Sequence, residues 1–102
     1  MSLTLVATIT PKPGRADAVR EVLTGAIPRV HQEPGCELYA LHEDEKGFVF
    51  VERWASQEEM GAHGRGETFT SVLAAITDDL AEPVSVRVVR PVPAGDPAKG
   101  AV

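Results

Sequence analysis

The sequence predicts a small α+β domain whose elements follow one another as strand, helix, strand, strand, helix and strand. Four short segments alternate apolar with polar residues, which is typical of strands, and two longer segments repeat apolar residues every three or four positions, which is typical of helices. A polar turn that contains glycine separates the second and third alternating segments and predicts a hairpin. A chain of 102 residues suffices for one such domain with a modest hydrophobic core.

The first strand and the first helix are predicted from the N-terminal third of the chain. The strand has apolar residues at every second position: Leu3, Leu5, Ala7 and Ile9. The Pro-Lys-Pro-Gly run at 11–14 ends it. A helix is then predicted over residues 15–32, from the stripe Val19, Val22, Leu23, Ala26, Ile27 and Val30. Pro28 lies inside this stripe and has no backbone N–H, so we expect a kink or an altered last turn near 24–28.

The second and third strands are predicted over residues 36–42 and 48–54, on either side of the turn Asp44-Glu45-Lys46-Gly47. Glycine at its last position suits a positive φ. In the third strand one face carries Phe48, Phe50, Glu52 and Trp54, and the other carries Val49, Val51 and Arg53. Apolar residues on both faces predict that both faces are covered, one by helices and the other by a second copy of the chain.

The C-terminal half predicts two helical segments and a last strand. Ser56 with Glu59 forms a capping box, which predicts a short helix that reaches about His63 and is broken by Gly64 and Gly66. A second helix is predicted up to Pro83 from the stripe Phe69, Val72, Leu73, Ile76 and Leu80. Val84, Val86 and Val88 then alternate with polar residues as a strand. Residues 91–102 hold three prolines and two glycines without periodicity, which predicts a flexible or draped tail after one domain of residues 1–90.

This element order is the ferredoxin-like split β-α-β-β-α-β arrangement, an antiparallel sheet with its helices on one face. The other face then carries Val49 and Val51. A homodimer that packs sheet against sheet around a two-fold axis would bury it.

The composition limits the partners. Ten Lys and Arg residues stand against fifteen Asp and Glu residues, and the net charge is −5, so no nucleic acid and no membrane are expected as partners. No apolar run approaches the roughly 20 residues of a membrane span, and the N-terminus lacks a signal-peptide pattern. The single cysteine, Cys36, cannot form an internal disulfide, which favours a reducing, cytoplasmic location.

Candidate functional residues gather where the third strand ends. The strand finishes with Glu52-Arg53-Trp54, and His63 follows one short helix later. A few convergent polar groups beside apolar side chains are what a small ligand pocket requires.

His63 is the candidate catalytic base. Imidazole titrates near neutral pH, so it can accept a proton from a phenol or an activated carbon acid. The alternative role is structural, because a histidine near a helix C-terminus also interacts with the last carbonyl groups of that helix.

Trp54 and Glu52 are the other candidate catalytic residues. The Trp54 indole could stack on a flat substrate or donate its N–H to an oxyanion; the alternative is a large core residue. A carboxylate on an apolar face has a raised pKa unless it is paired, so Glu52 could serve as a base. The alternative for Glu52 is an ion pair with an arginine of a neighbouring strand or subunit, namely Arg53, Arg87 or Arg90.

Four aromatic residues are candidates for binding a substrate: Phe48, Phe50, Phe69 and Tyr39. The phenylalanines could equally be core residues, and Tyr39 could face a second subunit. No metal is expected, because His42 beside the acidic residues 43–45 lacks the paired spacing of metal ligands.

Three blocks of the sequence resemble the antibiotic biosynthesis monooxygenase domain family: Glu33-Pro34-Gly35-Cys36, Glu52-Arg53-Trp54 and Met60-Gly61-Ala62-His63. The resemblance covers residues 3–89. Family members often carry a Ser-Pro-His-Phe-like run shortly after the histidine. This chain has Gly66-Glu67-Thr68-Phe69 there, so the phenylalanine is kept and Thr68 stands where a second histidine would be.

The resemblance implies a dimeric α/β barrel and a cofactor-independent monooxygenase that acts on a small electron-rich aromatic, of quinol or anthrone type, with His63 as base. The implied partners are a second copy, the aromatic substrate and molecular oxygen, with no cofactor. The wider superfamily also holds haem-degrading enzymes, isomerases and proteins without known activity. Two alternatives therefore stay open, an isomerase or enolising enzyme and a non-catalytic dimeric protein that binds small molecules.

Overall fold

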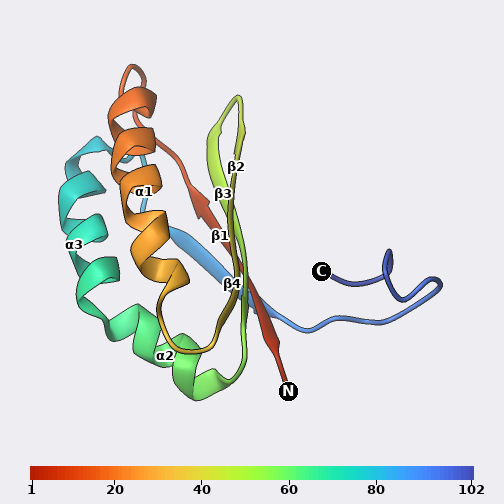
Figure 1. The fold of residues 1–102 in the computed structure, drawn as a ribbon. Helices are drawn as coiled ribbons and strands as arrows, with labels where there is room; N and C mark the ends of the chain where they lie inside the picture. The colour runs from red at the N-terminus through yellow and green to blue at the C-terminus, as the bar shows by residue number, and fades with distance from the viewer.

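The computed structural model describes residues 1–102 and has two layers, a four-stranded antiparallel sheet and a layer of helices on one of its faces (Figure 1). The sheet order is β2-β3-β1-β4. The strands are β1 (Leu3–Ile9), β2 (Cys36–Asp44), β3 (Gly47–Trp54) and β4 (Ser85–Val89). The helices are α1 (Ala16–His31), α2 (Gln57–Arg65), α3 (Glu67–Ile76) and the 3-10 helix η1 (Thr77–Asp79). The predicted α+β, ferredoxin-like architecture is confirmed.

The core lies between the helices and alternate residues of the central strands β1 and β3. Antiparallel pairing puts Ala7 opposite Phe50 and Ile9 opposite Phe48, and residues directly opposite share one face of a sheet. The alternation predicted for the third strand is confirmed, because one face is wholly buried: Phe48, Phe50, Glu52 and Trp54. The predicted stripe of α1 supplies the facing layer, in which the buried residues are Val19, Leu23, Ala26 and Val30.

The opposite face of the sheet carries no helix (Figure 1). Val51 lies near its centre, between Val6 of β1 and Ala40 of β2, and all three are half-buried. β4 is an edge strand, and its Val86 and Val88, which lie opposite Ala7 and Leu5 on the helix-covered side, are 50% and 54% exposed. Cover of the helix-free face by a second copy stays a prediction.

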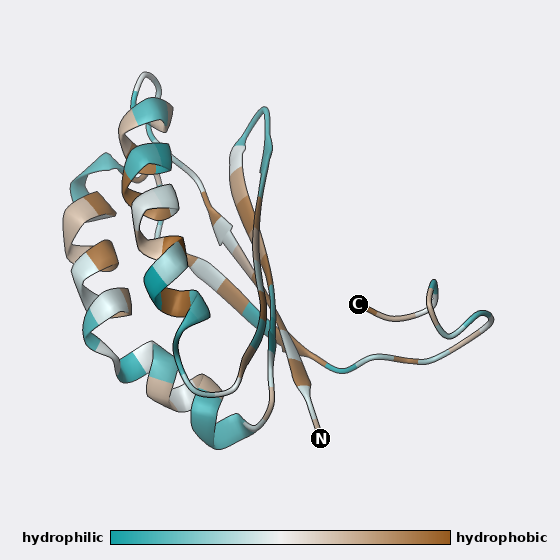
Figure 2. Cartoon of the chain, in the orientation of Figure 1, coloured by the Kyte–Doolittle hydropathy of each residue, from teal (hydrophilic) through white to brown (hydrophobic).

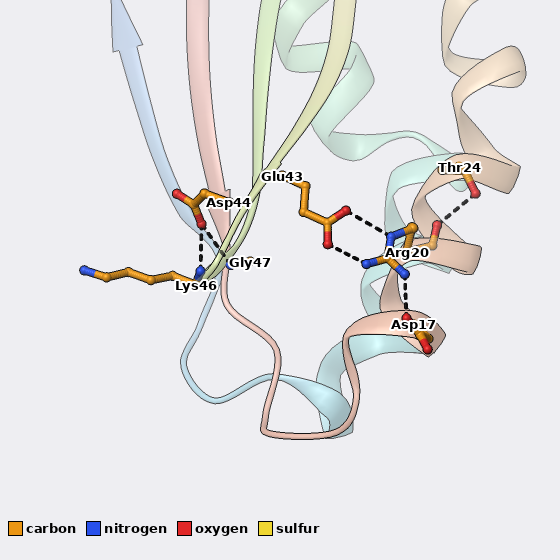
Figure 3. Close-up of polar contacts among 7 residues, drawn as sticks. All are labelled: Asp17, Arg20, Thr24, Glu43, Asp44, Lys46 and Gly47. Carbon is orange, nitrogen blue, oxygen red and sulfur yellow. Dashed lines mark hydrogen bonds and ion pairs between the residues drawn. The ribbon is translucent and has the colours of Figure 1, made fainter.

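The β2–β3 hairpin is closed by the turn that the sequence predicts. Its tip is hydrophilic, whereas the strands behind it are hydrophobic (Figure 2). Asp44 Oδ1 accepts hydrogen bonds from the backbone N–H groups of Lys46 and Gly47, at 2.8 and 3.0 Å (Figure 3). Gly47 has a φ of +150°, and a Cβ there would collide with the carbonyl oxygen of Ile9, so this position requires glycine.

Arg20 of α1 holds the hairpin against the helix layer. Its guanidinium bonds both carboxylate oxygens of Glu43 in β2 and also Asp17 (Figure 3). The same group lies 5.5 Å from the centre of the Phe48 ring. These contacts fix α1 over β2 and β3, the strands that carry most of the candidate residues.

The helix boundaries differ from the prediction in two places. α2 continues through Gly64 to Arg65, and the break falls at Gly66, whose extended backbone ends α2 and starts α3. α3 ends at Ile76, whereas the prediction extended this helix up to Pro83. The cause is tertiary, because Leu80 forms a β-bridge with Pro11 and the N–H of Ala81 donates to the carbonyl of Thr10.

α1 is one continuous helix through Pro28. Residues 90–102 are exposed and form no helix or strand. No helix has the length and apolar character needed to cross a membrane.

Candidate active site

A cavity of about 130 Å³ lies between the sheet and the helix layer. Thirteen of its sixteen lining residues are hydrophobic, and none is Lys or Arg. The aliphatic wall includes Leu5 and Ala7 of β1 and Leu73 of α3. The ionisable side chains at its surface are three: Tyr39, Glu52 and His63.

The Glu33-Pro34-Gly35-Cys36 run forms the turn that connects α1 to β2. The carbonyl of Glu33 accepts the N–H of Cys36 at 3.2 Å, Pro34 occupies the second position, and Gly35 has a φ of +79°. Proline followed by a glycine with positive φ is the pattern of a type II turn. The Gly35 carbonyl then accepts the N–H of Ala55, directly after β3. The turn therefore holds Glu33 beside the end of β3.

His63 lies in α2 and faces Glu33. Its Nδ1 is 2.8 Å from Glu33 Oε1; the side chains are 6% and 22% exposed. An ionised carboxylate only accepts hydrogen bonds, so the pair places the imidazole proton on Nδ1 and leaves Nε2 as the basic nitrogen. His63 borders both the inner cavity and an outer depression that Glu33 also lines. Its ring therefore stands between the cavity and the surface, and its partner is a carboxylate rather than its helix carbonyls.

Glu52 and Trp54 form a second buried pair on β3. Trp54 Nε1 donates to Glu52 Oε1 at 2.9 Å, and the side chains are 0% and 4% exposed for Trp54 and Glu52. None of the arginines that the sequence offered as partners bonds Glu52, and Arg53 instead bonds Glu37 on the other face. Burial raises the pKa of Glu52, an effect opposed by the Trp54 hydrogen bond and by His63. Glu52 is thus a buried carboxyl group whose pKa lies above its ordinary value.

Aromatic rings surround His63 on several sides. The Trp54 ring is stacked on it, with centroids 4.6 Å apart and planes at 27°. Tyr39 and Phe69 lie 5.5 and 5.4 Å away. Tyr39 is itself stacked on Phe50 at 4.3 Å. Burial, with Glu52 and Glu33 next in effect, raises the pKa of Tyr39, so its hydroxyl stays protonated.

The structure brings five of the seven predicted site residues to the cavity surface: His63, Glu52, Phe50, Phe69 and Tyr39. Trp54 lies behind His63 and Glu52 rather than on the cavity wall. Phe48 is a core residue beneath Arg20 and does not border the cavity. No group of three or more His, Cys, Asp or Glu side chains has the arrangement of a metal site.

Sequence reasoning missed Glu33 as a functional candidate. The only signal was its place at the start of the Pro-Gly turn, because its contact with His63 spans 30 residues. It also missed the aliphatic residues of the cavity wall. Two of them, Leu73 and Val84, lie between the cavity and a groove on the surface.

The chain is thus a small two-layer α+β protein with an apolar cavity between its sheet and its helices. The family model described as antibiotic biosynthesis monooxygenase matches residues 2–75, more than half of the chain. The protein belongs to this family, as its motifs indicate.

Solved structures agree with this assignment. Rv0793 from Mycobacterium tuberculosis superposes with a TM-score of 0.84 at 26% identity, over 94% of this chain and 100% of that one. A crystal structure named antibiotic biosynthesis monooxygenase has a TM-score of 0.82 at 29% identity, over 89% and 99%. PA3566 from Pseudomonas aeruginosa has a TM-score of 0.78 at 30% identity, over 86% and 91%. No curated protein matches the sequence.

Proposed function

We propose that this protein is a cofactor-independent monooxygenase that acts on a small electron-rich aromatic hydroxyl compound, with His63 as the base. One observation carries the proposal: a buried histidine, bonded through Nδ1 to a carboxylate, borders an apolar cavity. The family and the name of one similar structure support the reaction type.

The first step is removal of a hydroxyl proton from the substrate by Nε2 of His63. The imidazolium that forms is stabilised by Glu33, which lies 2.8 Å from Nδ1. Glu52 in its neutral form is a hydrogen-bond donor for the new oxyanion, while Trp54 occupies its other oxygen. The charge-separated pair then forms inside a site of low polarity.

The second step joins the substrate anion to oxygen. The anion passes one electron to O₂, and the resulting radical and superoxide combine in a bond between a ring carbon and oxygen. The peroxide takes up the proton held by His63. Loss of the proton on that carbon and cleavage of the O–O bond then release water and leave a carbonyl. A dihydroxybenzene and O₂ thus give a hydroxyquinone and water, with four electrons leaving the substrate.

Thr68 bears on this mechanism because it stands where relatives often carry a second histidine. It lines the outer depression with Glu33 and is not among the residues at the cavity surface. The proton steps above use only His63, Glu33 and Glu52, so they do not require a histidine at this position.

We propose further that the protein acts as a homodimer through the helix-free face of the sheet. Half-buried Val6, Val49 and Val51 lie on that face. A chain this small gains stability when a second copy covers such a surface.

The test is oxygen uptake by metal-free protein supplied with a panel of quinols and anthrones. We expect uptake by the wild type and a fall of about 100-fold or more in His63→Ala, the usual range for loss of a general base. His42→Ala is the matched control, because His42 is exposed on the hairpin and does not line the cavity. Circular dichroism is used to check that both variants are folded.

The other outcomes separate the alternatives. Turnover without oxygen consumption that is lost in His63→Ala would contradict the oxygenase and identify an isomerase or enolising enzyme. Ligand binding without turnover, unchanged in His63→Ala, would identify a binding protein.

A further inference from the structure

We infer that the cavity selects an uncharged aromatic compound with a single ring that carries hydroxyl groups, and that Leu73 sets this size limit. The inference rests on the proposed function for the identity of the reaction, and it concerns which members of the aromatic class enter the site.

The size of the cavity is the first argument. An enclosed cavity of about 150 Å³ accommodates one benzene ring, and pockets for larger ligands usually span roughly 300–1,000 Å³. The cavity here has about 130 Å³. A single ring therefore matches this volume, and a fused two- or three-ring compound exceeds it.

The charge of the wall is the second argument. None of the sixteen lining residues is Lys or Arg, whereas Glu52 lies at the surface of the cavity and Glu33 lies behind His63. A substrate that arrives with its own carboxylate or phosphate would be buried without a counter-ion. The raised pKa of Tyr39 has the same origin, since burial and the two glutamates disfavour an anion at this place. A neutral hydroxyl compound avoids this cost, because its anion forms only as the proton passes to His63.

The position of the polar groups is the third argument. Tyr39 lies directly opposite Glu52 in the sheet, and the ring of His63 is 5.5 Å from that of Tyr39. The remaining wall is almost wholly hydrophobic. One hydroxyl group of the substrate is therefore matched by these polar side chains, and the ring carbons are matched by the hydrophobic remainder of the wall.

Leu73 closes the cavity on the side of α3. Its side chain borders both the inner cavity and a surface groove of about 530 Å³ beneath η1 and the segment before β4. Truncation of this side chain joins the two spaces and gives room for a second ring. Leu80 borders the groove but not the cavity, so Leu80→Ala is a matched leucine control.

The experiment is anaerobic titration calorimetry with three compounds that differ in one property each. The compounds are 1,4-dihydroxybenzene, 1,4-dihydroxynaphthalene and 2,5-dihydroxybenzoate. The wild type is expected to bind the first at least about tenfold more tightly than the other two, since a misfit of one group in a pocket changes affinity by about 10–200-fold. Leu73→Ala is expected to recover at least about tenfold of affinity for the naphthalene compound, and Leu80→Ala is expected to recover none.

Equal affinity of the wild type for the one-ring and two-ring compounds would overturn the size limit. Equal affinity for the benzoate would overturn the charge selection, and no binding of any compound would overturn the inference as a whole. Leu73→Val replaces Leu73→Ala if the latter does not fold. Because oxygen is absent, selective binding here together with no oxygen uptake in the separate assay would refute the monooxygenase and leave the ring selectivity standing.

Discussion

At the scale of single residues, the site is built from two carboxyl groups in different environments. Glu33 is partly exposed and bonds a histidine, whereas Glu52 is buried and accepts a bond from an indole. Burial raises the pKa of Glu52. In the proposed mechanism these two chemically identical groups have different tasks: Glu33 stabilises a cation and Glu52 donates a hydrogen bond.

The pH dependence of stability tests the state of Glu52. Because its pKa is raised in the folded chain, the folded state binds more protons than the unfolded state, and stability falls as pH rises from the ordinary value of 4.5 through the folded pKa. Glu52→Gln keeps an acceptor for Trp54 and has no such loss. We expect the stability of the variant to rise relative to that of the wild type as pH increases, in urea unfolding between pH 4 and pH 8. A difference that does not vary with pH would contradict a raised pKa.

Individual site residues were only partly predictable from the sequence. His63, Glu52 and Trp54 were recognisable because they end or follow a strand with one apolar face. The partner of His63 was not, because Glu33 lies 30 residues earlier and meets it only through the packing of α2 beside the Pro-Gly turn. The sequence also suggested arginine partners for Glu52, yet the alternation of β3 puts Arg53 on the opposite face, where it bonds Glu37.

At the scale of elements, α2 decides where His63 lies. The hydroxyl oxygen of Ser56 accepts the N–H of Glu59 at 3.2 Å, so the first turn of α2 is fixed directly after β3. His63 follows two turns later, against the Trp54 ring at the end of the same strand.

Removal of this cap should therefore loosen the helix that carries the base. Ser56→Ala is expected to lower the free energy of unfolding by about 1 kcal/mol, which is about 4–8 °C in Tm for a domain of this size. Ser71→Ala is the matched control, because Ser71 is exposed within α3 and alanine favours a helix. Thermal unfolding followed by circular dichroism measures both, and equal Tm values for the two variants would contradict the capping role.

Strands and helix starts were predictable because their signals are local, namely the alternation of β1 and β3 and the capping box of α2. The end of α3 was not, because the stripe of apolar residues continues to Leu80. The chain leaves the helix at Ile76, and backbone bonds to residues 10–12 take the place of further helical turns. Such a boundary depends on contacts with the end of a strand some 70 residues away in the chain, so the residues around the helix end do not predict it.

At the scale of the whole molecule, one face of the sheet is covered and the other is not. The helix-covered face encloses the cavity, and the helix-free face has Val51 between Val6 and Ala40. The sequence predicted this asymmetry, since apolar residues occur on both faces of β3 while only two helical segments are available to cover them.

The proposed dimer makes Val51 a sensitive position. Val51→Arg would bury a charge between two sheets, so we expect the dimer to weaken by about 100-fold or more in sedimentation equilibrium. Val92→Arg, at a position 85% exposed in the C-terminal segment, is the control and should leave association unchanged. Identical association of Val51→Arg and the wild type would exclude this face as the interface.

The single tryptophan has a practical consequence for all of these experiments. Trp54 is fully buried, bonded to Glu52 and stacked on His63. An excited indole readily gives an electron to a neighbouring imidazolium and much less readily to a neutral imidazole. The tryptophan fluorescence of this chain is therefore an internal indicator of the charge on His63. The chain has no other tryptophan to contribute to the signal, and no added label is needed. Protonation of the base can therefore be followed by tryptophan fluorescence, in the unmodified protein and in real time.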